Sequence, residues 1–149
     1  MYLAFKDLAS LFADRQGIED DMVYYTVTDQ ANVVQPKGLF IRLTEESGEL
    51  SEAIANGAIA AIWDQENRVP QYTPNHFPIF FTNDPAVAIR NLLNLYNEKI
   101  DGETDEKMEI TNFKFTQKKL LNKNKETYDI AVMLKKVTNK SDIANERRG

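Results

Sequence analysis

Residues 36–64 carry the strongest indication of the fold, and they read PKGLFIRLTEESGELSEAIANGAIAAIWD. The apolar run 38–43 follows a Pro-Lys turn and predicts a strand, and the uncharged run 58–63 predicts a second strand. Between them, Ser47 and Gly48 can open a helix, which Gly57 can end by adopting a left-handed conformation. Continuous apolar strands of this kind are typical of a sheet covered on both faces, as in α/β proteins.

The elements on either side continue the alternation of helix and strand. Residues 3–12 have apolar side chains at three- and four-residue spacing, which predicts a helix, and residues 22–28 and 79–81 predict strands. Asp84-Pro85 predicts the start of a helix whose apolar stripe comprises Ala88, Ile89, Leu92, Leu93 and Tyr96. We therefore expect the α/β class, with a small mixed or parallel sheet flanked by helices.

Charge divides the chain in two. Residues 1–100 contain 7 lysines and arginines against 14 aspartates and glutamates, whereas residues 107–149 contain 11 against 5. This change predicts an α/β domain over residues 1–100 and a basic C-terminal segment over residues 101–149 with a frayed end. Alternating apolar residues favour a long β-hairpin in this segment, but its later part also fits a helix, with a stripe of Ile130, Met133, Leu134 and Val137.

Four pieces of the main domain resemble the amino-terminal domain of the Mur ligases. They are Pro-Lys-Gly-Leu-Phe at 36–40, Ala-Ile-Ala-Asn-Gly-Ala at 53–58, Pro-Ile-Phe-Phe at 78–81 and Asp-Pro-Ala-Val-Ala-Ile at 84–89. The resemblance covers residues 3–98, and it is greatest to the ligases that add the third amino acid or the D-alanyl-D-alanine dipeptide to UDP-N-acetylmuramoyl peptides. It implies a link to the synthesis of peptidoglycan precursors in the cell wall.

In that family the amino-terminal domain grips the uridine end of the substrate. The resemblance places a ligand site at five residues, namely Thr28, Asn32, Arg42, Thr44 and Ser47. The family's Asp-Ser-Arg motif falls on Gln-Ala-Asn at 30–32, so Ala31 lacks the hydroxyl that could bind uridine. The loop 44–48 also carries two glutamates, which repel a diphosphate. Binding of UDP-N-acetylmuramoyl compounds is therefore the second hypothesis.

The residues needed for ligase chemistry are missing from this sequence. An ATP-binding phosphate loop needs two glycines five residues apart followed by lysine, and no two of the six glycines have that spacing. There is no cysteine, and His76 is the only histidine, so the sequence predicts no metal site, no cofactor and no catalytic triad. We expect a binding or interaction module and not an enzyme.

Two further sets of residues are candidates for binding. Trp63, Asp64, Tyr72 and Phe77 could line a pocket at the carboxyl edge of the sheet, although core packing is the favoured interpretation. Four lysines of the basic segment could contact the phosphates of a nucleic acid, with Phe113, Phe115 and Tyr128 available for stacking; these are Lys114, Lys118, Lys119 and Lys123.

The acidic chain as a whole, with a pI of about 5.0, disfavours nucleic acid as the partner. An open hairpin edge instead favours a protein partner or self-association. No apolar run approaches the ~18 residues of a membrane span. We expect a cytoplasmic protein without a membrane partner.

Overall fold

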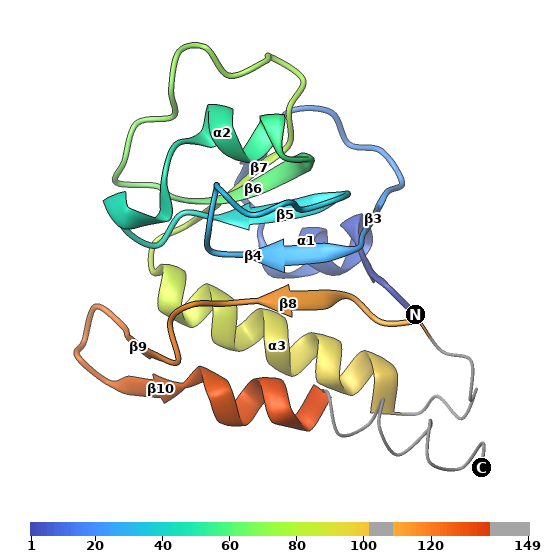
Figure 1. Cartoon of the computed structure of the whole chain (residues 1–149), viewed down its shortest axis with the longest axis vertical. Helices are drawn as coiled ribbons and strands as arrows, with labels where there is room; N and C mark the ends of the chain where they lie inside the picture. The colour runs from blue at the N-terminus through green and yellow to red at the C-terminus, as the bar shows by residue number, and fades with distance from the viewer. Residues whose placement is uncertain (102–108, 138–149) are drawn as a thin grey trace.

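The computed structural model describes residues 1–101 and 109–137, which form a six-stranded sheet with helices on both faces (Figure 1). The elements in chain order are β1 (Leu3–Ala4), α1 (Phe5–Leu11), β2 (Arg15–Gln16), β3 (Val23–Tyr24), β4 (Thr26–Thr28), β5 (Gly38–Ile41), the 3-10 helix η1 (Glu45–Ser47), α2 (Leu50–Ala55), β6 (Ala58–Asp64), β7 (Ile79–Thr82), α3 (Pro85–Asp101), β8 (Asn112–Lys114), β9 (Lys119–Leu121) and β10 (Thr127–Asp129). A further helix occupies residues 130–137. The α/β prediction is confirmed.

The sheet is mixed but mostly parallel. Its strand order is β2-β7-β6-β5-β4-β8, and β4 to β7 are consecutive parallel neighbours. β8 adds to the free edge of β4 in parallel, and β2 adds to β7 in antiparallel orientation. Two smaller antiparallel pairs, β1 with β3 and β9 with β10, lie outside this sheet.

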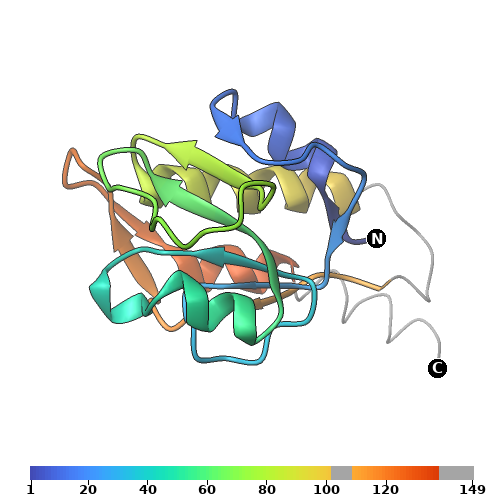
Figure 2. The same cartoon turned by 90° about the horizontal axis from the view of Figure 1, so that it is seen from above.

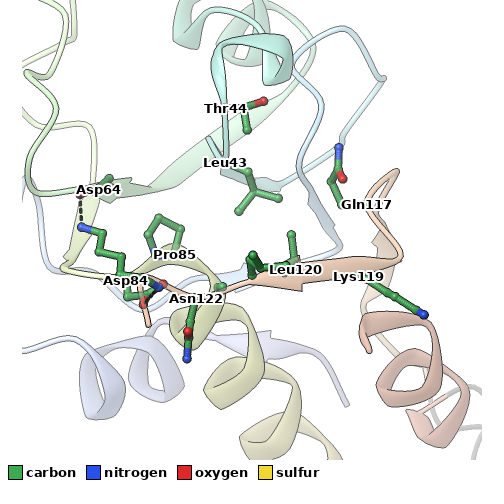
Figure 3. Close-up of a pocket in the computed structure, with 12 residues that line it drawn as sticks. Leu43, Thr44, Asp64, Asp84, Pro85, Gln117, Lys119, Leu120 and Asn122 are labelled. Carbon is green, nitrogen blue, oxygen red and sulfur yellow. Dashed lines mark hydrogen bonds and ion pairs between the residues drawn. The ribbon is translucent and has the colours of Figure 1, made fainter. Parts of the chain in front are cut away.

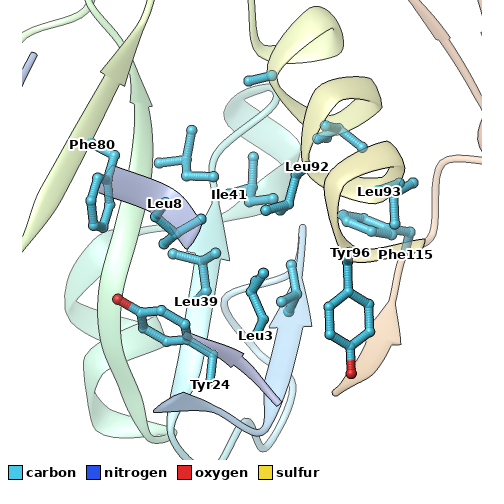
Figure 4. Packing of buried hydrophobic residues seen from close by; sticks show 14 of the residues in the cluster. Leu3, Leu8, Tyr24, Leu39, Ile41, Phe80, Leu92, Leu93, Tyr96 and Phe115 are labelled. Carbon is cyan, nitrogen blue, oxygen red and sulfur yellow. The ribbon is translucent and has the colours of Figure 1, made fainter. Parts of the chain in front are cut away.

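Alternate residues of the central strands pack into two separate cores. On β5, Leu39 and Ile41 belong to the core beneath α1 and α3, whereas Phe40 packs with Leu50 and Ala53 of α2 on the opposite face. Figure 2 shows α2 and α3 on opposite sides of the sheet, and Figure 4 shows the larger core between the strands and α3. Burial on both faces explains why these strands are apolar without interruption.

Two glycines let the β4–β5 loop approach the end of α2. Gly57 has φ of +116°, and a Cβ atom added there would lie 2.6 Å from the backbone oxygen of Gln35. A Cβ atom on Gly38 would lie 2.7 Å from the same oxygen. The prediction that Gly57 ends the helix is right, because α2 ends at Ala55 and Asn56 is its C-cap.

The basic segment folds differently from the long hairpin that alternation favours. Residues 112–114 enter the main sheet as β8, and the hairpin is the shorter β9–β10 pair, with its turn between Leu121 and Thr127. Residues 130–137 are helical, with Ile130 and Val137 buried and Val132 half exposed. This burial pattern fits a helix and not a strand, because in a strand Val132 would lie on the same buried face as Ile130.

The start of this helix has a local cause. Asp129 Oδ1 accepts a hydrogen bond from the Val132 backbone N–H at 3.1 Å, as an N-cap side chain does. The aspartate before the apolar stripe is therefore a signal in the sequence for ending the hairpin and starting the helix.

Within residues 1–101 and 109–137, no helix combines the length and apolar character needed to cross a membrane. The acidic stretch 102–106 and the end 141–149, which the sequence predicts to be frayed, lie outside the described residues.

Candidate functional site

A cavity of about 360 Å³ lies where the carboxyl ends of β5, β6 and β7 meet the start of α3 (Figure 3). The segment 117–123, which includes β9, covers it from the other side. Its apolar lining comprises Leu43, Pro85, Ala86, Leu120 and Leu121, and its charged lining comprises Asp64, Asp84, Lys119 and Lys123. The carboxyl edge of a parallel sheet is where open α/β folds usually bind ligands.

Lys123 joins the hairpin tip to the sheet at this cavity. Its Nζ lies 3.5 Å from Asp64 Oδ1 and 3.3 Å from Glu66 Oε2, and its backbone N–H donates to Asp84 Oδ2 at 2.7 Å. Desolvation lowers the pKa of Lys123, but the hydrogen bonds and attraction of Glu66 and Asp64 outweigh it and raise this pKa overall. Lys123 thus contacts both aspartates of the lining, Asp64 through its amine and Asp84 through its backbone N–H.

Asp29 holds the other end of the hairpin segment. This fully buried carboxylate follows β4 and accepts hydrogen bonds from Thr116 N (3.0 Å), Thr116 Oγ1 (3.0 Å) and Gln117 N (3.3 Å). On the α3 side, Arg90 donates to the Tyr128 hydroxyl at 2.9 Å and stacks on its ring. Three separate contacts therefore fix the hairpin against the sheet, and the cavity between them has defined walls.

Several of the five residues of the expected uridine site have their polar groups engaged within the chain. The Thr28 hydroxyl donates to the Lys114 backbone oxygen at 2.8 Å, and the buried Ser47 Oγ accepts from the backbone N–H groups of Leu43 and Thr44. Arg42 stacks over the Trp63 ring at 5.6 Å, and Asn32 is exposed. Of the five, Thr44 alone lines the cavity beside β9.

The four lysines of the nucleic-acid hypothesis are also dispersed. Lys114 Nζ donates to the Val34 backbone oxygen and Lys118 Nζ to that of Phe115, both at 3.4 Å, while Lys123 is paired with carboxylates. Lys119 lines the cavity, but its amine points away from it (Figure 3).

The aromatic rings proposed for base stacking already have other contacts. Phe113 packs on Tyr96 at 5.5 Å, Phe115 is buried, and Tyr128 lies beneath Arg90.

Core packing is confirmed for two residues of the expected aromatic pocket. Trp63 and Phe77 are buried in the smaller core, and Tyr72 is half exposed, with its hydroxyl accepting from Ser51 N at 3.1 Å. Only Asp64 of that set lines the cavity. His76 is exposed, and within the described ranges no three His, Cys, Asp or Glu side chains gather as a metal site would require.

Sequence reasoning missed Leu43, Pro85, Leu120 and Leu121 as lining residues. The pair Asp84-Pro85 predicts a helix start but gives no sign of what packs over it. The covering segment belongs to a hairpin almost 40 residues later, as the contact between Asp84 and Lys123 shows. The turn has a local signal, because its residues 122–125 read Asn-Lys-Asn-Lys. Asn122 organises it by accepting from Asn124 N and Glu126 N through Oδ1.

The lining suits recognition of shape and hydrogen-bonding groups. It combines aliphatic side chains with the Gln117 and Asn122 amides and with the paired charges of Asp64 and Lys123. No known protein family and no curated protein matches this sequence.

Proposed function

We propose that this chain is a binding and interaction module without catalytic activity of its own, and that the cavity beneath β9 is its contact site. The observation that carries the proposal is a hairpin fixed by Asp29, Asp84 and Arg90 so that a 360 Å³ cavity stays open at the carboxyl edge of the sheet. A held-open apolar cavity with a few polar groups is the usual form of a binding site.

The partner class in this proposal is a protein. Leu121, at the cavity rim, is 63% exposed although it belongs to a strand, and Leu43 and Leu120 face each other across the cavity (Figure 3). An exposed leucine that continues into the apolar lining of a cavity supports a protein contact. The resemblance of residues 3–98 to Mur ligase amino-terminal domains supports a setting in peptidoglycan precursor metabolism, and that setting is part of the proposal.

Retention of the UDP ligand is less well supported by the geometry. Thr28 and Ser47 use their hydroxyls within the chain, and Arg42 lies over Trp63. The loop from Thr44 adds the carboxylates of Glu45 and Glu46, both exposed, to the surface that a diphosphate would approach. A ligand would have to displace these internal bonds before gaining its own.

The proposal is tested by site-specific photocrosslinking in cells that contain the protein. A benzophenone amino acid is placed at Gln117, an exposed lining residue, and in a matched variant at Gln71, an exposed glutamine in the loop between β6 and β7. We expect a discrete adduct from position 117, none from position 71, and loss of the adduct when Leu43→Arg fills the cavity. An adduct of twice the chain mass identifies a second copy as the partner.

Three kinds of result would overturn this function. Equal adducts from both positions, or none from either, would remove the cavity as contact site. Saturable heat on titration with UDP-N-acetylmuramic acid would favour the UDP-binding alternative, and tight salt-sensitive binding of an oligonucleotide would favour the nucleic-acid alternative.

A further inference from the structure

β9 has one free edge, and the register of the hairpin shows which groups it presents. Leu121 pairs with Thr127, Leu120 with Tyr128 and Lys119 with Asp129. Backbone hydrogen bonds link Asn122 N to Glu126 O at 2.9 Å and Ile130 N to Lys118 O at 2.8 Å. In an antiparallel pair every second opposed pair is hydrogen-bonded, so Leu120–Tyr128 is the bonded pair between these two.

The backbone groups of Lys119 and Leu121 therefore point away from β10. Across residues 1–101 and 109–137, no hydrogen bond to the backbone N–H or C=O of either residue is present. The result is two donors and two acceptors in a row on one side of a strand. Such an edge is a template for another strand.

The cavity runs along this edge. Lys119, Leu120 and Leu121 all line it, although successive side chains of a strand point to opposite faces. Consecutive residues can line one cavity when the strand turns its edge toward it. Leu43 and Pro85 form the opposite wall, which leaves room for an apolar side chain next to the unpaired backbone.

We propose that an extended peptide segment of a partner protein binds as an additional strand on β9 and places one apolar side chain in the cavity between Leu43, Leu120 and Pro85. The proposal rests on the proposed function, because it names how that same cavity is occupied. Addition of a strand obtains its affinity from backbone hydrogen bonds and its specificity from side-chain pockets.

Charge around β9 is mixed. The hairpin region carries Lys118, Lys119, Lys123 and Lys125 against Glu126 and Asp129. Lys123 faces two carboxylates, those of Asp64 and Glu66, and Asp84 also lines the cavity. The backbone groups and the apolar side chain of the segment, and not its net charge, therefore decide what fits.

The test is selection from a displayed library of random nine-residue peptides against the immobilised full chain. We expect the enriched peptides to share an apolar residue at one position within a segment that can adopt an extended conformation. The Leu121→Pro variant removes one outward N–H and adds a ring at the free edge of β9. Thr127→Pro is its matched control, because Thr127 presents its N–H on the opposite edge of the same hairpin.

Leu121→Pro should reduce peptide binding by about tenfold or more, since a hydrogen bond and the strand approach are both lost, whereas Thr127→Pro should change it less than twofold. Leu121→Glu supplies a second variant that leaves the backbone unchanged, with Val132→Glu, half exposed on the last helix, as its control. Leu121→Glu should weaken peptide binding several-fold, because it replaces an apolar contact at the cavity rim with a charge that would have to be desolvated. Circular dichroism establishes that each variant is folded.

Failure to enrich any peptide, or equal binding by the Leu121 and control variants, would overturn strand addition. If the photocrosslink at Gln117 still forms, the cavity remains the contact site and only this mode of occupation is wrong. If the crosslink fails as well, both proposals fall.

Discussion

Removing the carboxylate of Asp29 should detach the start of the hairpin from the sheet. This side chain is fully buried at the end of β4, and its oxygens accept from Thr116 N, Thr116 Oγ1 and Gln117 N at 3.0–3.3 Å. The bonds join residues 87 and 88 positions apart in sequence. Asp29→Asn keeps one acceptor oxygen but turns an amide N–H₂ toward donors that need an acceptor.

The magnitude follows from these three bonds. Hydrogen bonds to a charged acceptor contribute roughly 1.5–3 kcal/mol each when both groups stay buried. Thr116 and Gln117 are exposed, so water can replace part of what they lose. We expect Asp29→Asn to lower the free energy of unfolding by about 2 kcal/mol and Asp29→Ala by about 3 kcal/mol.

Urea denaturation and hydrogen exchange read by mass spectrometry measure the two parts of this prediction. The control is Asp14→Asn, an exposed aspartate, which should change stability by less than about 0.5 kcal/mol. In Asp29→Asn, backbone amides of residues 116–129 should exchange faster than in the wild type, and this increase should exceed the increase in the central strands. Equal stability of Asp29→Asn and Asp14→Asn would refute the energetic reasoning, and unchanged exchange in the hairpin would refute Asp29 as its anchor.

Three further predictions concern two tyrosines, a lysine and a glycine. Tyr24→Phe should stabilise the fold by about 1 kcal/mol, because the buried Tyr24 hydroxyl has no hydrogen-bond partner among residues 1–101 and 109–137. Tyr96→Phe should destabilise the fold by about 1–2 kcal/mol, because the Tyr96 hydroxyl accepts from Thr111 N and donates to Met1 O. Thermal unfolding of the two variants tests this, and a change of the same sign in both contradicts the argument. The pKa of Lys123 is raised in the folded state, so its contribution to stability is complete below its ordinary value of 10.5 and is lost as pH rises through the raised value. The stability difference between the wild type and Lys123→Gln should shrink above that pH in denaturation curves, and a constant difference contradicts the ion pair. Gly57→Ala should lower the free energy of unfolding by about 3 kcal/mol, because the alanine Cβ atom would clash with the Gln35 backbone oxygen and the residue would keep a positive φ. A loss below about 1 kcal/mol, measured by urea denaturation, would show that the β4–β5 loop moves to relieve the clash.

The parts of the fold that sequence alone could predict are those with a local cause. Three such elements are the uncharged run 58–63, which forms most of β6 (Ala58–Asp64), the glycine after α2 and the Asp84-Pro85 start of α3. Each depends on residues within one turn or one strand. The position of β8 has no such cause. Its residues alternate like any hairpin strand, and only the open edge of β4, more than 80 residues earlier, decides where they pair.

The candidate site shows the same division more sharply, because hydroxyls and carboxylates that look available in a sequence compete for internal partners. Thr28 and Asp29 both bind the chain around residues 114–117, and Asp84 binds the backbone at Lys123. A side chain that holds a ligand and one that anchors a segment of the chain need the same chemistry, so the sequence alone cannot distinguish the two roles. Here the contacts with the docked hairpin show that these side chains are anchors. Once these polar groups are engaged, the unpaired backbone of Lys119 and Leu121 and the leucines beside it are what the carboxyl edge of the sheet offers a partner. Under the proposal, an extended peptide fits this surface better than a nucleotide does, because its backbone repeats donors and acceptors at the spacing of a strand.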